Sequence, residues 1–387
     1  MRALVYHGPE DVRVEERPKP VIGGPGDALV RVTNTTICGS DLHLYHGDIP
    51  DTREGDVFGH EFMGVVEEVG PEVRTLHPGD RVVVAAVIAD GTCWFCQHGQ
   101  FSLCDGTNPN PVMQEIYGQS IAGVFGYSHL VGGYDGGQAE YVRVPYADVG
   151  CLKVPEELRD EQVLFLSDIL CTGWMAAENG GVGPGQTVAV FGCGPVGLMA
   201  MASARIMGAQ RIIAIDRIGY RLDVARERFR AETINYDEDE PVKTLRELTH
   251  GRGPDVCIDA TGFRYARSLR HRVQKRVKLE SDAIDALSDA IRAVRKGGTV
   301  SIIGDYIGFA NQFPIGAVME KGLTLRSGQV HVQRYWRPLL ERIQRGELDP
   351  TFVITHRMPL DRAPEAYRLF DRKADGVLKV LLEPGAA

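Results

Sequence analysis

The segment at residues 185–217 constrains the fold more than any other part of the sequence. It predicts a strand, a glycine-rich turn, a helix and a second strand in direct succession. The first strand, TVAVF, has no polar face, as expected for a parallel strand that is buried on both sides. Further strands are predicted at residues 256–260 and 299–303, and helices at residues 220–229 and 281–294. This alternation is typical of an α/β domain with a doubly wound parallel sheet.

The turn in this segment reads GCGPVG and fits the pattern G-x-G-x-x-G of dinucleotide-binding folds. Gly192 would allow a tight turn, Gly194 would let a pyrophosphate approach the backbone, and Gly197 would let the helix pack closely on the strand. The phosphates would lie at the helix N-terminus, where free N–H groups favour negative charge. The pattern assigns the dinucleotide to Gly192, Gly194, Pro195, Val196 and Gly197.

Asp216 ends the second predicted strand and indicates which dinucleotide binds. A carboxylate there accepts hydrogen bonds from the adenosine ribose and repels a 2′-phosphate, so NAD is favoured over NADP. Arg217 and Arg221 weaken that preference, because an arginine pairs well with a phosphate group. Asp216 and the two arginines complete the cofactor residues that this segment predicts.

The rest of the chain predicts a second domain in two pieces. Residues 28–32, 63–69 and 81–86 are β-branched runs bounded by Gly, Pro and Asp, as in a small antiparallel barrel or sandwich. A further strand is predicted at residues 377–382. The predicted plan has three parts: a β-rich domain at residues 1–168, a dinucleotide-binding domain at residues 169–328, and a return to the first domain at residues 329–387.

Composition excludes several classes of function. The chain has 387 residues, of which 25% are charged and 43% hydrophobic, and these values disfavour long disorder and membrane spanning. The net charge of -9 makes the chain a poor binder of nucleic acid or of an anionic membrane. The N-terminal stretch lacks the apolar core of an export signal, so we expect a cytoplasmic protein. In a reducing compartment, its 8 cysteines indicate metal binding or catalysis rather than disulfides.

Two clusters contain residue types that bind metal. Cys38 and His60 offer a thiolate and an imidazole, and both suit zinc. Together with a hydride-carrying cofactor, they indicate a catalytic metal that polarises an alcohol or carbonyl oxygen. Cys93, Cys96 and Cys104 form a C-x-x-C pair with a third cysteine on the same loop, which is a zinc pattern. We interpret the other cysteines as packing residues: Cys151, Cys171, Cys193 and Cys257.

Four motifs occur in the order found in one enzyme superfamily: CGSDLH, GHEFMGVVEEVG, GQAEYVRVP and FGCGPVG. Over essentially its whole length, the chain resembles the zinc-dependent medium-chain alcohol dehydrogenases. Within that superfamily it looks most similar to glutathione-independent formaldehyde dehydrogenases, through FLSDILCTGW, DGTNPN and VHVQRYWRPLLERI. The resemblance implies a GroES-like catalytic domain joined to a Rossmann dinucleotide-binding domain.

The resemblance also implies roles for individual residues. Cys38, His60 and Asp168 would bind the catalytic zinc, with Asp168 in the place where most relatives have cysteine. Carboxylate is a harder ligand than thiolate, so this exchange should alter the Lewis acidity of the metal. Glu61 would be an occasional fourth ligand, and Asp41 would hold a ligand imidazole. Ser40 and His43 would form the proton relay. Thr172 would lie near the nicotinamide. Cys171 would not be a ligand.

In the same superfamily, a separate lobe holds a structural zinc with four cysteines. The lobe is expected at about residues 88–106, and Asp90 stands where the first of those cysteines would be. An Asp90, Cys93, Cys96 and Cys104 site is chemically sound, because aspartate also binds zinc. A closed shell of four ligands would leave no position for substrate, so this zinc would be structural.

The predicted function is transfer of hydride from a small alcohol or hydrated aldehyde to NAD, with formaldehyde as one candidate substrate. The enzymatic alternatives are an aldehyde dismutase with tightly bound NAD and a polyol dehydrogenase. A non-catalytic NAD-binding structural or sensor protein is a further alternative, although the metal set disfavours it and a zinc-free quinone reductase. Relatives form dimers or tetramers, so we expect a homo-oligomer, with the strand near residues 323–328 as a candidate interface.

A basic segment at residues 264–280 stands apart from these motifs. Leu269, Val273 and Val277 recur every four residues and predict a helix with one apolar stripe. A solvated surface helix is one interpretation, and a cover over the cofactor or a subunit contact is the other. The sequence leaves both open.

Overall fold

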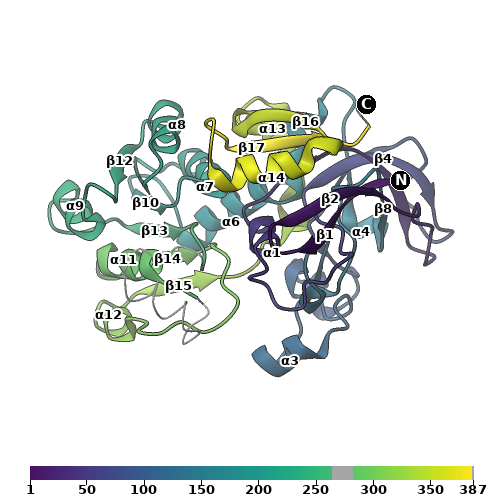
Figure 1. The fold of residues 1–387 in the computed structure, drawn as a ribbon. Coiled ribbons are helices and arrows are strands. Elements are labelled where there is room, and N and C mark those ends of the chain that lie inside the picture. The colour runs from purple at the N-terminus through teal and green to yellow at the C-terminus, as the bar shows by residue number, and fades with distance from the viewer. Residues whose placement is uncertain (264–281, 386–387) are drawn as a thin grey trace. The chain divides into compact units, whose positions relative to one another are not determined.

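The structure is a computed structural model that describes residues 1–263 and 282–385. The basic segment at residues 264–280 therefore lies outside the described residues. The chain forms two compact units: Met1–Cys171 with Val330–Ala387, and Thr172–Gln329 (Figure 1). The division falls within helix α6 (Ile169–Gly180).

The second unit contains a six-stranded sheet in which every pair of neighbouring strands is parallel. The strands are β10 (Thr187–Phe191), β11 (Arg211–Asp216), β12 (Glu232–Asn235), β13 (Val256–Asp259), β14 (Thr299–Ile302) and β15 (Thr324–Ser327). Their spatial order is β12-β11-β10-β13-β14-β15, so the chain winds outward in both directions from the β10–β13 pair. This order confirms the predicted doubly wound sheet and places its switch point between β10 and β13.

Helices cover both faces of this sheet, as alternation along β10 requires. Ala189 and Phe191 pack into an apolar cluster with residues of α9 and α11. Val188 and Val190 are also fully buried but point to the opposite face, because successive strand residues alternate. Besides α6, the helices in the described residues of this unit are α7 (Pro195–Ile206), α8 (Gly219–Phe229), α9 (Pro241–Leu248), α11 (Asp285–Ala293) and α12 (Ile315–Glu320).

The first unit is built on a sheet of seven strands, in the order β16-β17-β3-β4-β5-β9 with β8 also paired to β3. All of its pairs are antiparallel except β16 with β17. Its strands are β3 (Ala28–Thr36), β4 (Phe62–Val69), β5 (Arg81–Val84), β8 (Tyr141–Val144), β9 (Cys151–Lys153), β16 (Ile354–Pro359) and β17 (Lys379–Glu383). This sheet confirms the β-rich first domain of the predicted fold class, and the C-terminal strand β17 pairs with β3 in it.

Smaller elements complete the first unit. Two further antiparallel pairs are formed by β1 (Arg2–Gly8) with β2 (Asp11–Glu16), and by β6 (Val87–Ile88) with β7 (Gly123–Val124). The helices are α1 (Asp41–Tyr45), α2 (Trp94–Gln97), α3 (Pro111–Tyr117), α4 (Ala147–Gly150), α5 (Asp160–Val163), α13 (Val332–Gln344) and α14 (Ala363–Arg372). The 3₁₀ turns are η1 (Phe101–Leu103), η2 (His129–Val131), η3 (Leu164–Ser167), η4 (Pro350–Val353) and η5 (Leu360–Arg362).

Strand pairing in the first unit brings distant residues together. Thr35 of β3 pairs with Phe62 of β4, so the chain just after β3 lies beside the chain just before β4. Thr35 and Thr36 also pair with Leu382 and Leu381 of β17. Register therefore determines that residues near 38, 60 and 379 meet at one end of β3.

Some predicted elements end earlier or start later than expected. The strand predicted at residues 81–86 ends at Val84, because the amide groups of Ala85 and Ala86 donate to Gly150 and Ser167 instead of to the sheet. The helix predicted at residues 281–294 begins only at Asp285. The carboxylate of Asp282 instead accepts hydrogen bonds from a neighbouring loop.

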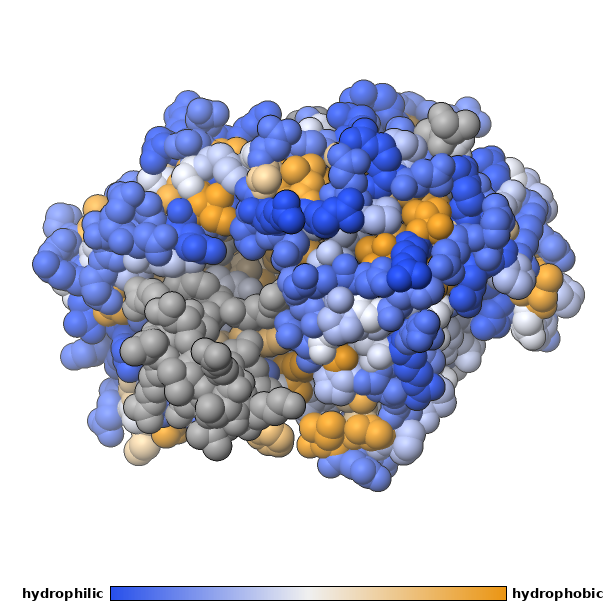
Figure 2. All heavy atoms as spheres, in the orientation of Figure 1, coloured by the Kyte–Doolittle hydropathy of each residue, from blue (hydrophilic) through white to orange (hydrophobic). Residues whose placement is uncertain are grey.

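The surface is mostly hydrophilic, with a few apolar areas (Figure 2). One of them covers α3, where Val112 and Ile116 are 39% and 46% exposed. Within the described residues, every helix is too short or too polar to cross a lipid bilayer.

Candidate metal centres and dinucleotide site

The structure brings the four predicted donors of the catalytic metal together. Cys38 follows β3, His60 and Glu61 precede β4, and Asp168 follows η3. Their ligand atoms all lie within 4.8 Å of one another. Asp168 Oδ2 lies 3.4 Å from His60 Nε2 and 4.0 Å from Cys38 Sγ. Sulfur, nitrogen and oxygen donors at this spacing suit one tetrahedral zinc ion.

The charge of this site also fits a metal cation. Asp41 and Glu61 are fully buried, the Asp168 side chain is 15% exposed, and Cys38 adds a buried thiol. Among the described residues, Lys379 supplies a buried ammonium beside these groups. Burial of several acidic groups beside one ammonium is costly unless further positive charge balances them.

The imidazole of His60 responds to this imbalance. Burial lowers the pKa of His60, but Asp41 and Asp168 raise it by more, so its pKa lies well above the ordinary value. A metal cation would take the place of that proton, because a histidine ligand must be neutral. The donor set and its charge therefore fit zinc.

Asp41 lies next to two of the donors, Cys38 and His60. Its Oδ2 accepts a hydrogen bond from the backbone N–H of Cys38 at 2.8 Å and another from Gln138 Nε2 at 3.3 Å. Its Oδ1 lies 3.0 Å from His60 Nδ1, at an angle that does not make a hydrogen bond. Gln138 is in turn held by the hydroxyl of Tyr367 at 2.8 Å. This network fixes the backbone of Cys38 and the Asp41 carboxylate relative to each other, with the His60 imidazole next to Asp41.

Glu61 has a partner that the sequence analysis missed. Its Oε2 accepts hydrogen bonds from Lys379 and Thr36, while its Oε1 is buried without a partner among the described residues. Burial lowers the pKa of Lys379, but Glu61 and Cys38 raise it by more, so the ammonium stays charged. The signal was present in the sequence, because Lys379 interrupts the apolar run VLKVLL.

The proposed proton-relay residues lie beside the donors. Ser40 Oγ is 3.3 Å from His60 Nε2. His43 lies on α1, and its backbone N–H donates to the carbonyl of Ser40 at 3.0 Å. The two side chains therefore belong to one short turn that starts at the donor cluster.

The second predicted cluster also assembles. Ligand atoms of Asp90, Cys93, Cys96 and Cys104 lie within 4.8 Å of one another, with Cys93 Sγ and Cys104 Sγ 3.9 Å apart. Cys93 caps α2, and its Sγ accepts from the N–H of Cys96 at 3.5 Å. The N–H of Asp90 donates to Cys104 Sγ at 3.3 Å. These N–H groups favour the thiolate, and the pKa of Cys93 is lowered, whereas burial raises the pKa of Cys96 and of Cys104. A zinc ion would favour the thiolate form of all three.

The Asp90 side chain is held in place by backbone amides. Its Oδ1 accepts hydrogen bonds from Thr92 at 2.7 Å and from Cys93 at 2.9 Å. Burial raises the pKa of Asp90, but these hydrogen bonds lower it by more, so the carboxylate stays ionised. An ionised, fixed carboxylate beside three thiols fits a four-ligand zinc site.

In the second unit, the glycine turn has the predicted geometry. Gly192 has a φ of +91°, which an L side chain rarely adopts. A Cβ atom on Gly197 would lie 1.9 Å from the carbonyl oxygen of Gly192, so helix α7 packs directly on the turn. Gly194 caps α7 with Pro195 and Val196 in its first turn, which leaves the N–H groups at this helix end available for phosphate.

Asp216 fastens the end of β11 to this turn. Its Oδ2 accepts a hydrogen bond from the backbone N–H of Cys193 at 2.7 Å. Its Oδ1 accepts from the backbone N–H groups of Arg217 at 2.7 Å and Ile218 at 3.0 Å. These three hydrogen bonds leave acceptor capacity on the carboxylate for a ribose hydroxyl. The sequence had assigned Asp216 to the ribose alone, so this structural role is an addition.

The predicted arginines differ in position. Arg221 Nη1 would be 3.6 Å from a Cβ atom on Gly194, and its Nε is buried without a partner among the described residues. Arg217 is exposed on the loop after β11. Thr172 is the first residue of the second unit and is 9% exposed.

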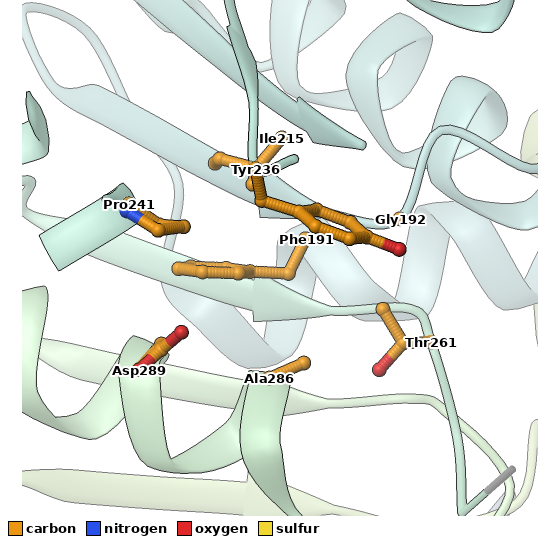
Figure 3. Close-up of a pocket in the computed structure, with 8 residues that line it drawn as sticks. All are labelled: Phe191, Gly192, Ile215, Tyr236, Pro241, Thr261, Ala286 and Asp289. Carbon is orange, nitrogen blue, oxygen red and sulfur yellow. The ribbon is translucent and has the colours of Figure 1, made fainter. Parts of the chain in front are cut away.

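A small pocket lies beside the glycine turn (Figure 3). Tyr236 and Phe191 place their rings on it, and Gly192 and Thr261 border it. The other lining residues are Ile215, Pro241, Ala286 and Asp289. The free volume of this pocket is about 10 Å³, which is room for one water molecule, so its side chains pack closely against the glycine turn. Tyr236 and Thr261 had not been singled out in the sequence, because neither belongs to the glycine motif.

The remaining cysteines are buried and free: Cys151, Cys171, Cys193 and Cys257. Cys171 is fully buried, and its thiol donates to the carbonyl of Leu166 at 3.3 Å. It does not belong to either group of metal donors in the described part of the chain.

A β-rich unit with two groups of metal donors and a unit with a dinucleotide turn together define a metal-dependent dehydrogenase. Residues 24–156 match the family described as the alcohol dehydrogenase GroES-like domain, and residues 195–273 match the family described as zinc-binding dehydrogenase. The chain belongs to the zinc-dependent medium-chain alcohol dehydrogenases and is an oxidoreductase.

Individual relatives support this assignment. A zinc-type alcohol dehydrogenase-like protein of Schizosaccharomyces pombe is 43% identical over 98% of this chain and 90% of its own length. The structure of an alcohol dehydrogenase from Thermus sp. ATN1 matches with a TM-score of 0.85 and 40% identity over 99% of both chains. A glutathione-independent formaldehyde dehydrogenase of Pseudomonas aeruginosa is 35% identical over 96% of this chain and 94% of its own length. The formaldehyde dehydrogenase is thus a weaker relative than the zinc-type alcohol dehydrogenase.

The two donor groups predict the metal content of single-residue variants. We expect two zinc ions per chain in the wild type, one in Asp90→Ala, and one in Cys38→Ser, because each variant removes one ligand from a different site. Mass spectrometry of the dialysed protein measures the zinc content. Cys171→Ala is the control and should keep both ions. Retention of both ions by Cys38→Ser would contradict the ligand assignment.

Proposed function

We propose that this protein is an NAD-dependent, zinc-containing dehydrogenase of small alcohols and hydrated aldehydes. One observation carries the proposal: the side chains of Cys38, His60 and Asp168 meet in one mostly buried, acidic cluster. The same chain holds a dinucleotide-type glycine turn whose Cys193 N–H donates to Asp216. When bound, zinc would supply Lewis-acid polarisation of the substrate oxygen, and NAD would accept the hydride.

The protein's own residues prepare this chemistry. Cys38, His60 and Asp168 would hold the metal, and Asp41 accepts a hydrogen bond from the backbone of Cys38 and lies 3.0 Å from Nδ1 of His60. Asp168 keeps some solvent exposure, unlike Asp41 and Glu61, so the side of the site beside Asp168 is the open one. Glu61 is engaged by Lys379 and remains close enough to act as an additional ligand.

A proton must leave when an alcohol or a hydrated aldehyde is oxidised. Ser40 would accept it from the substrate hydroxyl, because its Oγ lies next to His60 at the donor cluster. His43, on the same short turn, would pass it on, since imidazole exchanges protons near neutral pH. Hydride, the other product of breaking the C–H and O–H bonds, would go to NAD.

The cofactor residues would act as follows. The backbone of Gly192, Gly194 and Gly197, with Pro195 and Val196, would cradle the pyrophosphate, and Asp216 would bind the adenosine ribose. Arg221 would add positive charge to the pyrophosphate, because it lies over Gly194. Arg217 would remain at the edge of the ribose site and Thr172 near the nicotinamide.

Asp90, Cys93, Cys96 and Cys104 would hold a second, structural zinc ion. The thiolates of both sites require a reducing compartment, which supports a cytoplasmic location. The substrate would be a small primary alcohol or an aldehyde hydrate, and similarity to a formaldehyde dehydrogenase supports formaldehyde as a candidate. A hydrate carries a hydroxyl group and a C–H bond on one carbon, so the same residues oxidise it without a thiol nucleophile.

Self-association would involve surfaces that each unit leaves exposed. Strand β15 is an edge strand of its sheet, and the connection that precedes it carries Phe309, Ile315 and Met319 at 78%, 66% and 78% exposure. Unpaired strand edges and apolar patches favour association, so we propose a homo-oligomer.

Preference for NAD should depend on Asp216. In Asp216→Ser, we expect the ratio of kcat/KM for NAD to that for NADP to fall by roughly 10- to 100-fold, because ribose hydrogen bonds and repulsion of a 2′-phosphate are lost. Steady-state kinetics with each cofactor measures this ratio. Asp223→Asn on α8, whose carboxylate is 58% exposed, is the control and should leave the ratio unchanged. Equal wild-type rates with NAD and NADP would refute the role of Asp216.

A screen of small alcohols and aldehydes, with NADH formation followed by absorbance, tests the proposed function. We expect turnover of primary alcohols or formaldehyde with NAD. Conversion of an aldehyde to equal amounts of alcohol and acid without added NAD would instead identify a dismutase, and preference for sugar alcohols a polyol dehydrogenase. Absence of turnover with every alcohol and aldehyde in the presence of zinc would contradict the proposal.

A further inference from the structure

Asp259 is a fully buried carboxylate at the carboxyl end of β13, and none of the roles assigned above uses it. Its Oδ1 accepts hydrogen bonds from the Thr261 hydroxyl at 2.6 Å and from the Thr261 N–H at 3.0 Å. Its Oδ2 accepts from the hydroxyl of Tyr306 at 2.7 Å. Burial raises the pKa of Asp259, while these donors oppose the rise. A fully buried carboxylate needs hydrogen-bond donors, and the hydrogen bonds hold those donor groups in a defined position.

The groups bound to Asp259 belong to two loops. Thr261 lies on the loop after β13, and Tyr306 lies on the loop after β14. The backbone of Asp259 joins the same loops, because its carbonyl accepts from the N–H groups of Ile303 and Gly304, both at 2.9 Å. A Cβ atom on Gly304 would lie 2.4 Å from the backbone nitrogen of Gly262, so the two loops pack main chain against main chain.

A second carboxylate fixes the far part of the β14 loop. Asp282 is 1% exposed, and its Oδ2 accepts from the N–H groups of Ile307 at 2.8 Å and Gly308 at 2.9 Å. The loop is therefore held at Tyr306 by Asp259 and just beyond it by Asp282. Such double anchoring defines one conformation for residues 304–308.

The position of these loops in the sheet relates them to the dinucleotide. Asp259 pairs in register with Phe191 of β10, which directly precedes the glycine turn. Thr261 approaches that turn, since a Cβ atom on Gly192 would lie 3.0 Å from the Thr261 methyl group. Figure 3 shows Thr261 at the border of the pocket that Tyr236 and Phe191 line. Both loops thus lie at the carboxyl ends of the strands, beside the switch point where dinucleotides bind.

Strand order also determines which half of the dinucleotide meets these loops. Asp216 and the ribose it would bind lie at β11, on one side of β10, and the pyrophosphate would lie at the turn after β10. The other half must continue toward β13 and β14, on the opposite side of β10. Tyr306, on the loop after β14, is therefore on the nicotinamide side of the pyrophosphate, whereas Thr261 lies between the two halves, because it borders one pocket with Ile215 and Tyr236.

We propose that Asp259 is a positioning residue that holds the Thr261 turn and the Tyr306 loop in the shape that receives the nicotinamide half of the dinucleotide. This inference rests on the proposed NAD-dependent function. Asp259 itself does not touch the cofactor in this proposal, because its side chain is fully buried and its oxygens are occupied by Thr261 and Tyr306.

Binding of cofactor fragments tests the proposal without relying on activity. In Tyr306→Phe, we expect calorimetry to show NADH binding weakened by roughly tenfold, because a hydrogen bond to a buried carboxylate is lost and the loop is released. Binding of AMP, which reports on the adenosine half alone, should change by less than about twofold. Asp216→Ser is the matched control on the other side of the turn: it removes the acceptor proposed for the adenosine ribose and should weaken AMP and NADH together.

Two further variants separate positioning from general destabilisation. Thr261→Val should weaken NADH binding at least as much as Tyr306→Phe, and the conservative Thr261→Ser should restore NADH binding to the wild-type value, because it keeps the hydroxyl. The double variant Asp259→Asn with Tyr306→Phe should bind NADH no more weakly than Asp259→Asn alone, since both disrupt one interaction.

The proposal would be overturned if Tyr306→Phe weakened AMP and NADH equally, or if neither ligand were affected. The first result would mean that Asp259 only stabilises the unit, and the second that the loop contributes nothing to binding. Wild-type protein that binds AMP and NADH but oxidises no alcohol or aldehyde would contradict the proposed function and leave the positioning role standing. Wild-type protein that binds neither ligand would overturn both.

Discussion

A buried excess of negative charge at one end of strand β3 is the constraint on which the first unit depends. Asp41, Glu61 and Asp168 meet there beside the thiol of Cys38, with Lys379 as the buried ammonium. Carboxylates withdrawn from water to this degree destabilise a fold unless cations and hydrogen bonds compensate them. The raised pKa of His60 shows that the protein would take up a proton there if nothing else supplied positive charge. A zinc ion meets the same need and adds the chemistry of a dehydrogenase.

The strand pairing of the first unit places these charged groups next to one another. Neighbouring registers of β3 with β4 and with β17 bring Cys38, His60 and Lys379 together from positions far apart in the chain. A one-residue slip of either pairing would turn the side chains of that strand to the opposite face. Metal binding and correct register therefore support each other, and the metal should contribute to the stability of this unit.

The same local device recurs at the functional loops of both units. An aspartate accepts hydrogen bonds from backbone N–H groups of a tight turn: Asp41 from Cys38, Asp90 from Thr92 and Cys93, Asp216 from Cys193, and Asp282 from Ile307 and Gly308. Short acidic side chains suit this purpose, because they replace the missing partners of a backbone that is neither helix nor strand. Rigid loops then present ligands and N–H groups without a large entropic cost on binding.

The sequence was sufficient for features that are local. GCGPVG with Asp216 predicted the turn and the doubly wound sheet, and the spacing of Cys93, Cys96 and Cys104 predicted their cluster. The sequence was insufficient for side-chain contacts between segments that lie far apart in the chain. Lys379 opposite Glu61 and Tyr306 against Asp259 depend on strand order and loop packing, which no single segment encodes. Resemblance to known dehydrogenases predicted that Asp168 lies beside Cys38 and His60. The spacing of these residues alone did not predict it.

Anomalous scattering from crystals of the protein at the zinc absorption edge tests the central claim most directly, because it locates zinc independently of activity. The account predicts a peak about 2.3 Å from Cys38 Sγ and about 2.0–2.2 Å from a nitrogen of His60 and an oxygen of Asp168. A peak bound by other residues, or none at this position in crystals grown with zinc, would contradict it.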